Sequence, residues 1–358
     1  MQRRGGGESG RDGRGARTIV TLADVARAAG VHYSTVSRAL DPVSPAHVNP
    51  ETRQRVQALA KRMGYQKDMV ASGLKRGRTH TVAVIAGDLG NPNLAPVLRG
   101  IAGGLEQAGL MTLISETQFD SERLERILNH LMSRRVDAII MTAARPDDAP
   151  TLRWIRRQGI PLVLAIQTVP GIRLPACTND DHLGGVLAAR HLLSLGHRRL
   201  AQLRGPMEFS SCFLRAQGFS ETVAAAGAEE VLVKSTSLWG SPELGGALMR
   251  ELLDQKGVRP TGIFAHHDLT AVGALTAAEE RGLTCPRDLS IVGYHNLPHN
   301  DRIAPPLTSI SQPREELGRA AAEILITVLT KPGQRPAPRL VRPSLVVRKS
   351  TGPPPTAS

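Results

Sequence analysis

The residues with the most specific chemistry lie close to the N-terminus, in the segment HYSTVSRAL. Tyr33, Ser34 and Arg38 occur at spacings that place them on the outward face of one helix. Tyrosine and serine hydroxyls can reach base edges or phosphates, and an arginine can bind a guanine edge through two hydrogen bonds. The chemistry indicated by these residues is recognition of DNA through hydrogen bonds.

Two short helices must position these side chains. Thr21 can cap the first helix, because Asp24 follows at the Ser/Thr-x-x-acid spacing of a capping box. Gly30 suits a tight turn, and a second helix is expected from Tyr33 to Leu40. The first helix has one apolar face, formed by Leu22, Val25, Ala26 and Ala29. The pattern predicts a helix-turn-helix, whose second helix lies in the DNA major groove. The alternative is a helical hairpin within a larger all-helical core.

A third helix completes a small all-α domain predicted over residues 18–66. Asn49 can cap this helix, Pro50 suits its first position, and Gly64 ends it. Its buried stripe is expected to be Val56, Leu59, Ala60 and Met63. The basic segment 67–80 that follows is predicted to be a linker.

Positive charge is concentrated in the N-terminal part of this 358-residue chain. Residues 1–80 hold 15 Lys and Arg against 6 Asp and Glu, a net charge of +9. Residues 81–358 hold 30 against 26, so they contribute only +4 of the formal +13. The excess of positive charge lies in the same part of the chain as the predicted helix-turn-helix, and binding to the phosphates of a nucleic acid favours such a charge. Residues 1–17, rich in Arg and Gly, are predicted to be a disordered basic leader.

Cysteine usage and hydropathy indicate the compartment. The three cysteines are isolated, with no C-x-x-C pair, so no disulfide framework is expected. The N-terminus has no apolar core of a signal peptide, and no apolar run approaches the ~18 residues of a membrane span. These features predict a cytoplasmic protein with no membrane partner.

From residue 81 the pattern changes to short β-branched runs that alternate with helical segments. The expected strands are TVAVIA, MTLIS, VDAIIMTAA, PLVLAI, RRLAQL, VLVKST, GIFAHH and LSIVGY. The helices between them are expected near residues 94–110, 122–134, 147–158, 183–195, 213–226, 243–256 and 269–281. This alternation predicts parallel sheets covered on both faces, built as two doubly wound lobes in series over residues 81–351. A ligand would then sit between the lobes, beyond the carboxyl ends of the strands. Residues 352–358 are predicted to be a disordered tail.

The complete order of elements resembles the lactose-repressor (LacI) family of transcription regulators. The motifs that carry the resemblance are TLADVARAAGVHYSTVSRAL, ETRQRVQALAKRMGY, GHRRLAQLRGP, FAHHDLTAVGAL, LSIVGYHN, PLTSISQP and SLVVRKST. The resemblance implies a periplasmic-binding-protein-like core, a homodimer, a palindromic operator and a small-molecule effector such as a sugar or sugar phosphate. The implied function is that of a repressor whose operator affinity the effector controls.

The resemblance also assigns DNA contacts. Tyr33, Ser34 and Arg38 fall at base-reading positions, and Thr35 and Ser37 fall where phosphate contacts are expected. Further contacts are expected from Thr21, His32 and His47. His32 departs from the small hydroxyl residue usual before the recognition helix, so it either weakens the cap or adds a phosphate contact.

The linker resembles the family's hinge helix, which wedges a leucine into the minor groove. That leucine would be Leu74. The family usually has Pro-Asn where Lys67 and Asp68 stand, and Gly73 disfavours a helix by ~1 kcal/mol relative to Ala. The alternative is that the basic KRGR sequence acts as a tether to phosphates.

Six residues are assigned to the effector site by the same resemblance. They are Asp88, Asn91, Arg215, Asp268, His295 and Gln312. His295 stands where an aspartate is common, His267 where an asparagine is common, and Asn93 where a phenylalanine is common. A protonated His295 together with Arg215 would favour an anionic effector. The aromatic platform usual for sugars is missing from the first loop, and Trp239 is a candidate replacement.

Three other functions compete with this interpretation. An enzyme is disfavoured because the chain has no G-x-G-x-x-G after a strand, no P-loop and no G-x-S-x-G. No metal site or cofactor is expected, since the adjacent His266 and His267 would diverge on a strand. A periplasmic solute-binding protein is disfavoured by the DNA-binding segment. An effector-independent DNA binder with a degenerate cleft remains an alternative.

Overall fold

The computed structural model describes residues 20–40, 48–65, 78–233, 240–255, 257, 259–331 and 333–356. The chain divides into two compact units, Met1–Thr79 and His80–Ser358. Several predictions fall outside the described residues: those for the leader 1–17, for His47, for Leu74 with most of the linker 67–80, and for Trp239. Among the described residues, no helix is long and apolar enough to cross a membrane.

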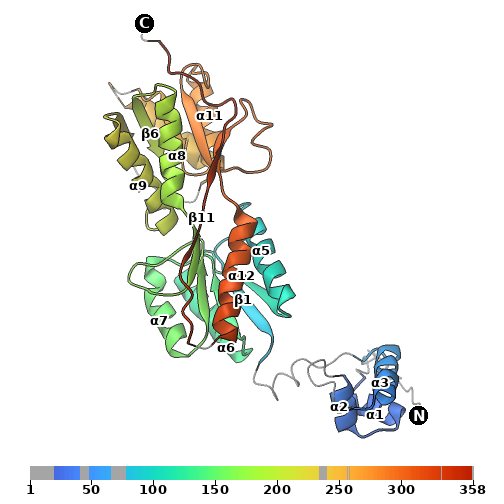
Figure 1. The fold of residues 1–358 in the computed structure, drawn as a ribbon. Coiled ribbons are helices and arrows are strands. Elements are labelled where there is room, and N and C mark those ends of the chain that lie inside the picture. The colour runs from blue at the N-terminus through green and yellow to red at the C-terminus, as the bar shows by residue number, and fades with distance from the viewer. Residues whose placement is uncertain are drawn as a thin grey trace, which may run out of the picture. The chain divides into compact units, whose positions relative to one another are not determined.

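The first unit is a three-helix domain of α1 (Leu22–Ala29), α2 (Tyr33–Ala39) and α3 (Pro50–Arg62) (Figure 1). The Thr21 hydroxyl accepts from the Asp24 amide at 3.3 Å, and the Asp24 carboxylate accepts from the Thr21 amide at 2.9 Å. Gly30 has a φ of 63°, which permits the tight turn after α1. The core contains the fully buried valines 25, 36 and 56, one from each helix. The predicted helix-turn-helix is confirmed.

The second unit consists of two lobes, each with a six-stranded sheet (Figure 1). The first sheet has the order β11-β5-β4-β3-β1-β2, and the second has the order β12-β10-β9-β8-β6-β7. The strands of the first lobe are β1 (Thr81–Ala86), β2 (Met111–Glu116), β3 (Ala138–Met141), β4 (Leu162–Ala165), β5 (Ala176–Asn179) and β11 (Arg339–Val341). Those of the second are β6 (Arg199–Leu203), β7 (Glu229–Leu232), β8 (Gly262–Ala265), β9 (Ser290–His295), β10 (Thr308–Ser311) and β12 (Ser344–Val346).

Helices cover both faces of each sheet, as predicted. The first lobe carries α5 (Leu94–Gln107), α6 (Ser121–Ser133), the 3₁₀ turn η2 (Pro146–Asp148), α7 (Ala149–Arg157) and α12 (Arg314–Thr330). The second carries α8 (Asp181–Ser194), α9 (Ser210–Ala225), α10 (Pro242–Asp254) and α11 (Asp268–Glu280). Each lobe accordingly has two apolar clusters, one on either face of its sheet.

The prediction that the lobes follow each other in series is wrong. After β10 the chain returns to the first lobe as α12 and β11, and it then crosses back as β12 (Figure 1). The sequence analysis assigned no element to β5, β10 or α12. β12 pairs antiparallel with β10, so the second sheet is mixed and not wholly parallel. β7 also begins two residues earlier than the predicted run VLVKST.

Reciprocal glycines let three pairs of helices cross closely. A Cβ at Gly100 of α5 would collide with the carbonyl oxygen of Glu315 in α12, and one at Gly318 would collide with that of Val97. Gly185 and Gly218 play the same part between α8 and α9, and so do Gly245 and Gly273 between α10 and α11. The close crossing of α5 and α12 attaches the returning chain to the first lobe.

A pair of alanine substitutions in α5 tests this packing. Gly100→Ala should lower the free energy of unfolding by about 1–3 kcal/mol, because backbone must move to admit the methyl group. Gly103→Ala should instead raise it by up to about 1 kcal/mol, since a Cβ there meets nothing within 4 Å. Urea unfolding followed by circular dichroism measures both changes. If both substitutions changed the free energy of unfolding equally, the crossing of α5 and α12 would have to tolerate a side chain at Gly100.

Candidate nucleic-acid interface and interlobe pocket

Helix α2 has one buried side and one exposed side. Val36 and Ala39 are buried against the other two helices. His32, Tyr33, Ser37 and Arg38 are exposed, with Tyr33 at 51% of its full exposure, while Ser34 and Thr35 are half-buried. Thr21 is exposed at the start of α1. The predicted base-reading side chains therefore share the solvent side of α2.

His32 takes over the capping role of the usual hydroxyl residue. Its Nδ1 accepts a hydrogen bond from the Ser34 amide at 3.3 Å and lies 2.8 Å from the Ser34 hydroxyl. Its ring also packs against that of Tyr33, with 4.7 Å between the centroids. The departure therefore preserves the cap and orients two predicted contact residues.

The second unit contains a pocket of about 650 Å³ at the carboxyl ends of strands from both lobes. In each sheet the order of strand addition reverses between two neighbouring parallel strands, β1 and β3 in one sheet and β6 and β8 in the other. Gly87 and Asp88 follow β1, Thr142 follows β3, and His267 follows β8, and all four line the pocket. The predicted position of a ligand site coincides with this cavity.

The pocket brings together five of the six predicted effector residues: Asp88, Asn91, Arg215, His295 and Gln312. Asp268 lies outside the lining. It is buried at the start of α11, where its carboxylate accepts from the Ser309 hydroxyl at 2.6 Å and the Leu297 amide at 2.7 Å. Burial raises the pKa of this carboxyl to about 6. Asp268 thus anchors the segment between β9 and β10, because both oxygens are bound by the chain itself.

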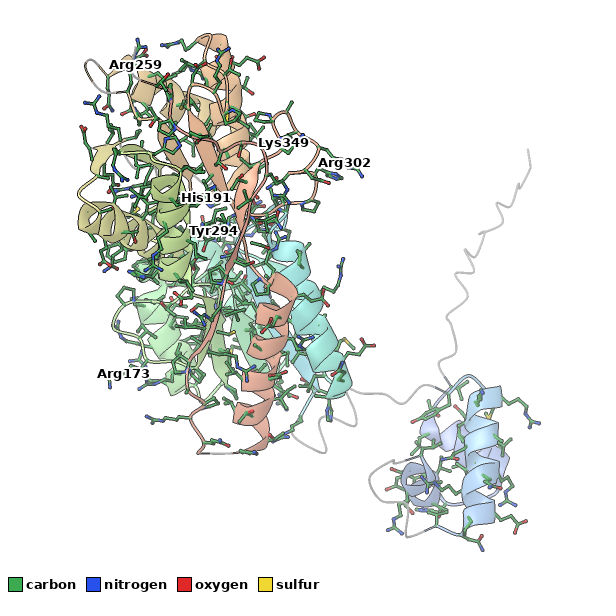
Figure 2. All side chains as sticks on the ribbon, turned by 45° about the horizontal axis from the view of Figure 1, so that its top comes forward. Arg173, His191, Arg259, Tyr294, Arg302 and Lys349 are labelled. Carbon is green, nitrogen blue, oxygen red and sulfur yellow. The ribbon has the colours of Figure 1, made fainter. Side chains whose placement is uncertain are left out.

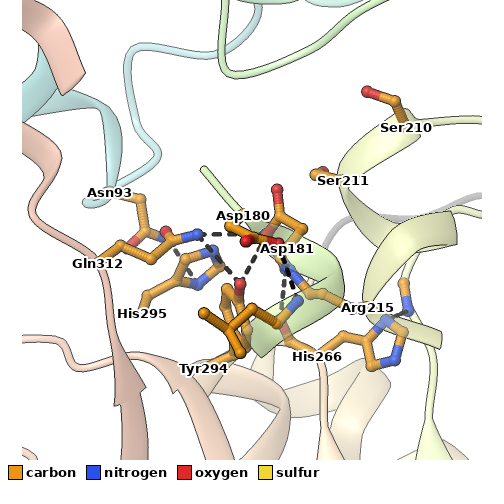
Figure 3. A network of polar contacts seen from close by, with 12 residues as sticks. Asn93, Asp180, Asp181, Ser210, Ser211, Arg215, His266, Tyr294, His295 and Gln312 are labelled. Carbon is orange, nitrogen blue, oxygen red and sulfur yellow. Dashed lines mark hydrogen bonds and ion pairs between the residues drawn. The ribbon is translucent and has the colours of Figure 1, made fainter. Parts of the chain in front are cut away.

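Arg215 belongs to a buried polar network, drawn in Figure 3. Its Nε donates to the carboxylate of Asp181 at 2.8 Å, and its Nη1 donates to the carbonyl of His266 at 2.8 Å. The guanidinium carbon lies 3.8 Å above the centre of the Tyr294 ring. The Tyr294 hydroxyl donates to the same Asp181 oxygen at 2.7 Å. Arg215 is therefore held in one orientation with its charge balanced.

The surroundings of His295 disfavour a protonated ring. It is only 6% exposed, and burial together with the charge of Arg215 lowers its pKa well below the ordinary value. Its Nδ1 lies 3.1 Å from the amide nitrogen of Asn93, which donates to it. This environment weighs against the hypothesis of an anionic effector, which invoked a protonated His295 together with Arg215.

Two sets of hydrogen bonds join the lobes across the pocket. On one side the Gln167 amide donates to the Ser211 hydroxyl at 2.8 Å, and its oxygen accepts from the Ser210 hydroxyl at 3.0 Å. On the other side Asn93 bonds His295, and Arg314 donates to the Asn296 carbonyl at 3.4 Å while it holds the Asn93 oxygen at 2.8 Å within the first lobe. Figure 3 labels Ser210 and Ser211 from the first set and Asn93 and His295 from the second. Gln167, Ser211, Asn93 and Arg314 were not predicted, because they meet only when the lobes do.

Two further lining residues escaped the sequence analysis. Phe119, between β2 and α6, supplies an aromatic ring, which packs edge-on against Phe209 at 5.5 Å between centroids. Asn179, the last residue of β5, is 4% exposed, and its side-chain oxygen has no hydrogen-bond partner among the described residues. The β-strand that ends at Asn179 was itself not predicted, so no signal pointed to the residue.

The adjacent histidines 266 and 267 face different neighbours. His266 lies 2.9 Å from the side-chain oxygen of Gln202, and the His267 ring lies 5.1 Å from that of His295. Within the described ranges no group of three or more His, Cys, Asp and Glu side chains could hold a metal ion. The two histidines therefore do not form a common ligand set.

Comparison with known proteins identifies the family. Residues 21–68 match bacterial regulatory proteins of the lacI family, and residues 189–351 match a periplasmic binding protein-like domain. The repressor CytR of Escherichia coli is 31% identical over 338 residues, which cover 93% of this chain and 97% of CytR. The regulator DegA of Bacillus subtilis is 34% identical over 339 residues, covering 93% and 98%. This chain belongs to the lacI family. It is a DNA-binding transcriptional regulator.

Three solved structures of regulators are similar to this chain over 76% or more of its length. The Lac repressor dimer bound to operator and the anti-inducer ONPF is 26% identical with a TM-score of 0.84, covering 94% of this chain and 100% of that one. A CelR–cellobiose complex is 29% identical with a TM-score of 0.70, covering 92% and 99%. A regulator from Enterococcus faecium with bound ribose is 30% identical with a TM-score of 0.66, covering 76% and 99%.

The buried histidines of this lacI-family protein should make it sensitive to acid. Burial lowers the pKa of His267 to about 3, whereas a histidine in the unfolded chain titrates near 6.5. Below pH 6.5 the unfolded state therefore binds a proton that the native state does not, and stability falls by about 1.4 kcal/mol per pH unit for that residue. Between pH 7.5 and pH 5 the natural chain should therefore lose about 2 kcal/mol more unfolding free energy than the His267→Gln variant.

Urea unfolding at a series of pH values measures this difference. His130→Gln is the control, because His130 lies exposed on α6. The control should follow the pH dependence of the natural chain. If His267→Gln did so as well, a neutral His267 in the native state would be contradicted.

Proposed function

We propose that this protein is a homodimeric repressor whose affinity for a palindromic operator depends on a small molecule bound between its two lobes. The observation that carries the proposal is the position of the interlobe hydrogen bonds. Gln167, Ser211, Asn93, His295 and Arg314 line the pocket and also make those bonds. A ligand that enters must exchange contacts with them, so its binding free energy differs between arrangements of the lobes.

The lining supports a small polar ligand with one apolar face. Its hydrogen-bonding groups are mainly neutral amides and hydroxyls, including Asn91, Asn179, Gln312 and Thr142. Phe119 offers the aromatic surface on which sugars and nucleobases stack. The structures with bound cellobiose and ribose support a sugar as the effector class.

The DNA contacts are proposed from the exposed side of α2. Tyr33, Ser34 and Arg38 would read bases, while Thr35 and Ser37 would bind phosphates. His32 and Thr21 would support them from the two helix starts, and contacts from His47 and Leu74 are proposed by family resemblance alone. The operator-bound Lac repressor dimer supports this arrangement and the homodimer.

The remaining proposals concern organisation. We assign residues 18–66 to DNA binding, 67–80 to the hinge and 81–351 to effector binding and dimerisation, with 1–17 and 352–358 as terminal extensions. We expect no enzymatic activity, because the relatives carry the names of regulators. We also expect action in the cytoplasm, where operator DNA is found.

Substitutions of Arg38 distinguish base reading from phosphate binding. Arg38→Ala should weaken operator binding by about 1–3 kcal/mol and relax the preference at one base pair. Arg38→Lys keeps the charge and loses the two-pronged guanine contact, so it should fail to restore that preference. Gel-shift titrations against single-base operator variants at fixed salt measure both. Full rescue by lysine would reassign Arg38 to a phosphate.

A second experiment tests the pocket. Asn179→Leu removes a buried oxygen that has no partner among the described residues, so it should leave the melting temperature unchanged or raise it. It should also weaken effector binding by about tenfold, the value of one hydrogen bond of 1.4 kcal/mol. A thermal-shift screen of sugars and nucleosides, followed by calorimetry, supplies the ligand and the affinities. An unchanged affinity would remove Asn179 from the ligand contacts.

A further inference from the structure

Arg215, one of the two arginines that line the pocket, has a carboxylate as counter-charge within the protein. Arg215 is 3% exposed and Asp181 is 1% exposed, and their side chains are 2.8 Å apart. Asp181 is the first residue of α8, placed there by the crossover from β5, and it is not part of the pocket lining. The positive charge of Arg215 is thus cancelled from behind, on the side away from the ligand.

We infer that the pocket is built for an uncharged ligand and that Asp181 sets this preference by neutralising Arg215. The inference rests on the proposed effector function and specifies the chemical class of the effector. Asp181 acts through Arg215 and is a positioning residue, since it does not line the cavity itself.

Part of the hydrogen-bonding capacity of Arg215 is used inside the network. Nε is bound to Asp181, Nη1 is bound to the His266 carbonyl, and one face of the guanidinium lies on Tyr294. The Nη2 group and the second N–H of Nη1 make no hydrogen bond to the described residues, so they can donate to hydroxyls of a ligand. The charge that would attract an anion is already balanced by Asp181.

Arg314 is held by neutral acceptors. Two of its N–H groups donate to the Asn93 oxygen at 2.8 Å and to the Asn296 carbonyl at 3.4 Å. Burial lowers the pKa of its guanidinium, and the carboxylate of Asp268 acts in the opposite direction. Asp88 adds an exposed carboxylate to the lining, and that carboxylate would repel an anion at the entrance.

The other polar groups point to the same class of ligand. His267 and His295 are buried, and burial lowers the pKa of each ring, so neither contributes a positive charge at neutral pH. The partnerless oxygen of Asn179 accepts hydrogen bonds and would repel an anionic oxygen. An anion would lose its hydration beside an Arg215 whose charge is already paired with Asp181, whereas a sugar hydroxyl can donate to the Asn179 oxygen.

Paired ligands that differ only by a phosphate test the inference on the full chain. D-ribose is compared with D-ribose 5-phosphate, and inosine with inosine 5′-monophosphate, by thermal shift and titration calorimetry at fixed ionic strength. The neutral member of a pair should bind at least tenfold more tightly. Equal or tighter binding of the phosphorylated members would overturn the inference and leave the effector function intact. Failure of all four, and of the wider sugar and nucleoside screen, would remove the effector function and the inference with it.

Two neighbouring aspartates then separate the role of Asp181 from a general effect of charge. Asp181→Asn frees the guanidinium and should shift the affinity ratio at least tenfold toward the phosphorylated member. Asp180→Asn is the matched control: it removes an adjacent negative charge, and asparagine can keep the cap bond to the Leu183 amide. The control should leave the ratio unchanged. A folded Asp181→Asn chain with an unchanged ratio would overturn the role of Asp181. If that variant does not fold, the ratio measured on the natural chain still decides the ligand class.

Discussion

The buried ion pair of Arg215 and Asp181 is the interaction on which the second lobe depends most. It joins the start of α8 to the middle of α9, and through Tyr294 and the His266 carbonyl it also reaches β9 and the end of β8. Removing one partner of such a pair costs about 3–5 kcal/mol, because the other charge is left buried and uncompensated. The helices can approach closely enough to form the pair because Gly185 lies against the Arg215 backbone.

The same network lies where the chain passes between the lobes. Asp181 follows the first crossover, from β5 to α8, and Gln312 lies in the second, from β10 to α12. The Gln312 amide lies 3.3 Å from the Asp181 carboxylate and from the Tyr294 hydroxyl. Tyr294, labelled in Figure 2, belongs to this network. The network therefore connects the pocket to the segments that join the two lobes.

The first unit is organised by simpler forces. Three valines, a capping box and one left-handed glycine define its helices, and none of these depends on the second unit. His32 shows how such a unit tolerates change, since a ring nitrogen replaces a hydroxyl oxygen as the cap of α2. The reading surface can therefore vary while the scaffold that presents it stays the same.

The sequence alone determined everything that depends on local spacing. Caps, turns and apolar periods predicted the three N-terminal helices and most elements of the α/β unit, and family motifs indicated five of the residues that line the pocket. Only the tertiary structure decided which lobe receives α12 and β11. The apolar face of a helix does not specify which of two sheets it packs against.

The charge state of the pocket was likewise decided in three dimensions. Arg215 is paired with a residue 34 positions away, and burial in the folded chain lowers the pKa of His295. Asp268 was assigned to ligand binding by its motif, but its carboxylate stabilises the fold, since it accepts hydrogen bonds from the Leu297 amide and the Ser309 hydroxyl. Burial and long-range partners determine the chemistry of each side chain, and neither can be predicted from the adjacent residues in the sequence.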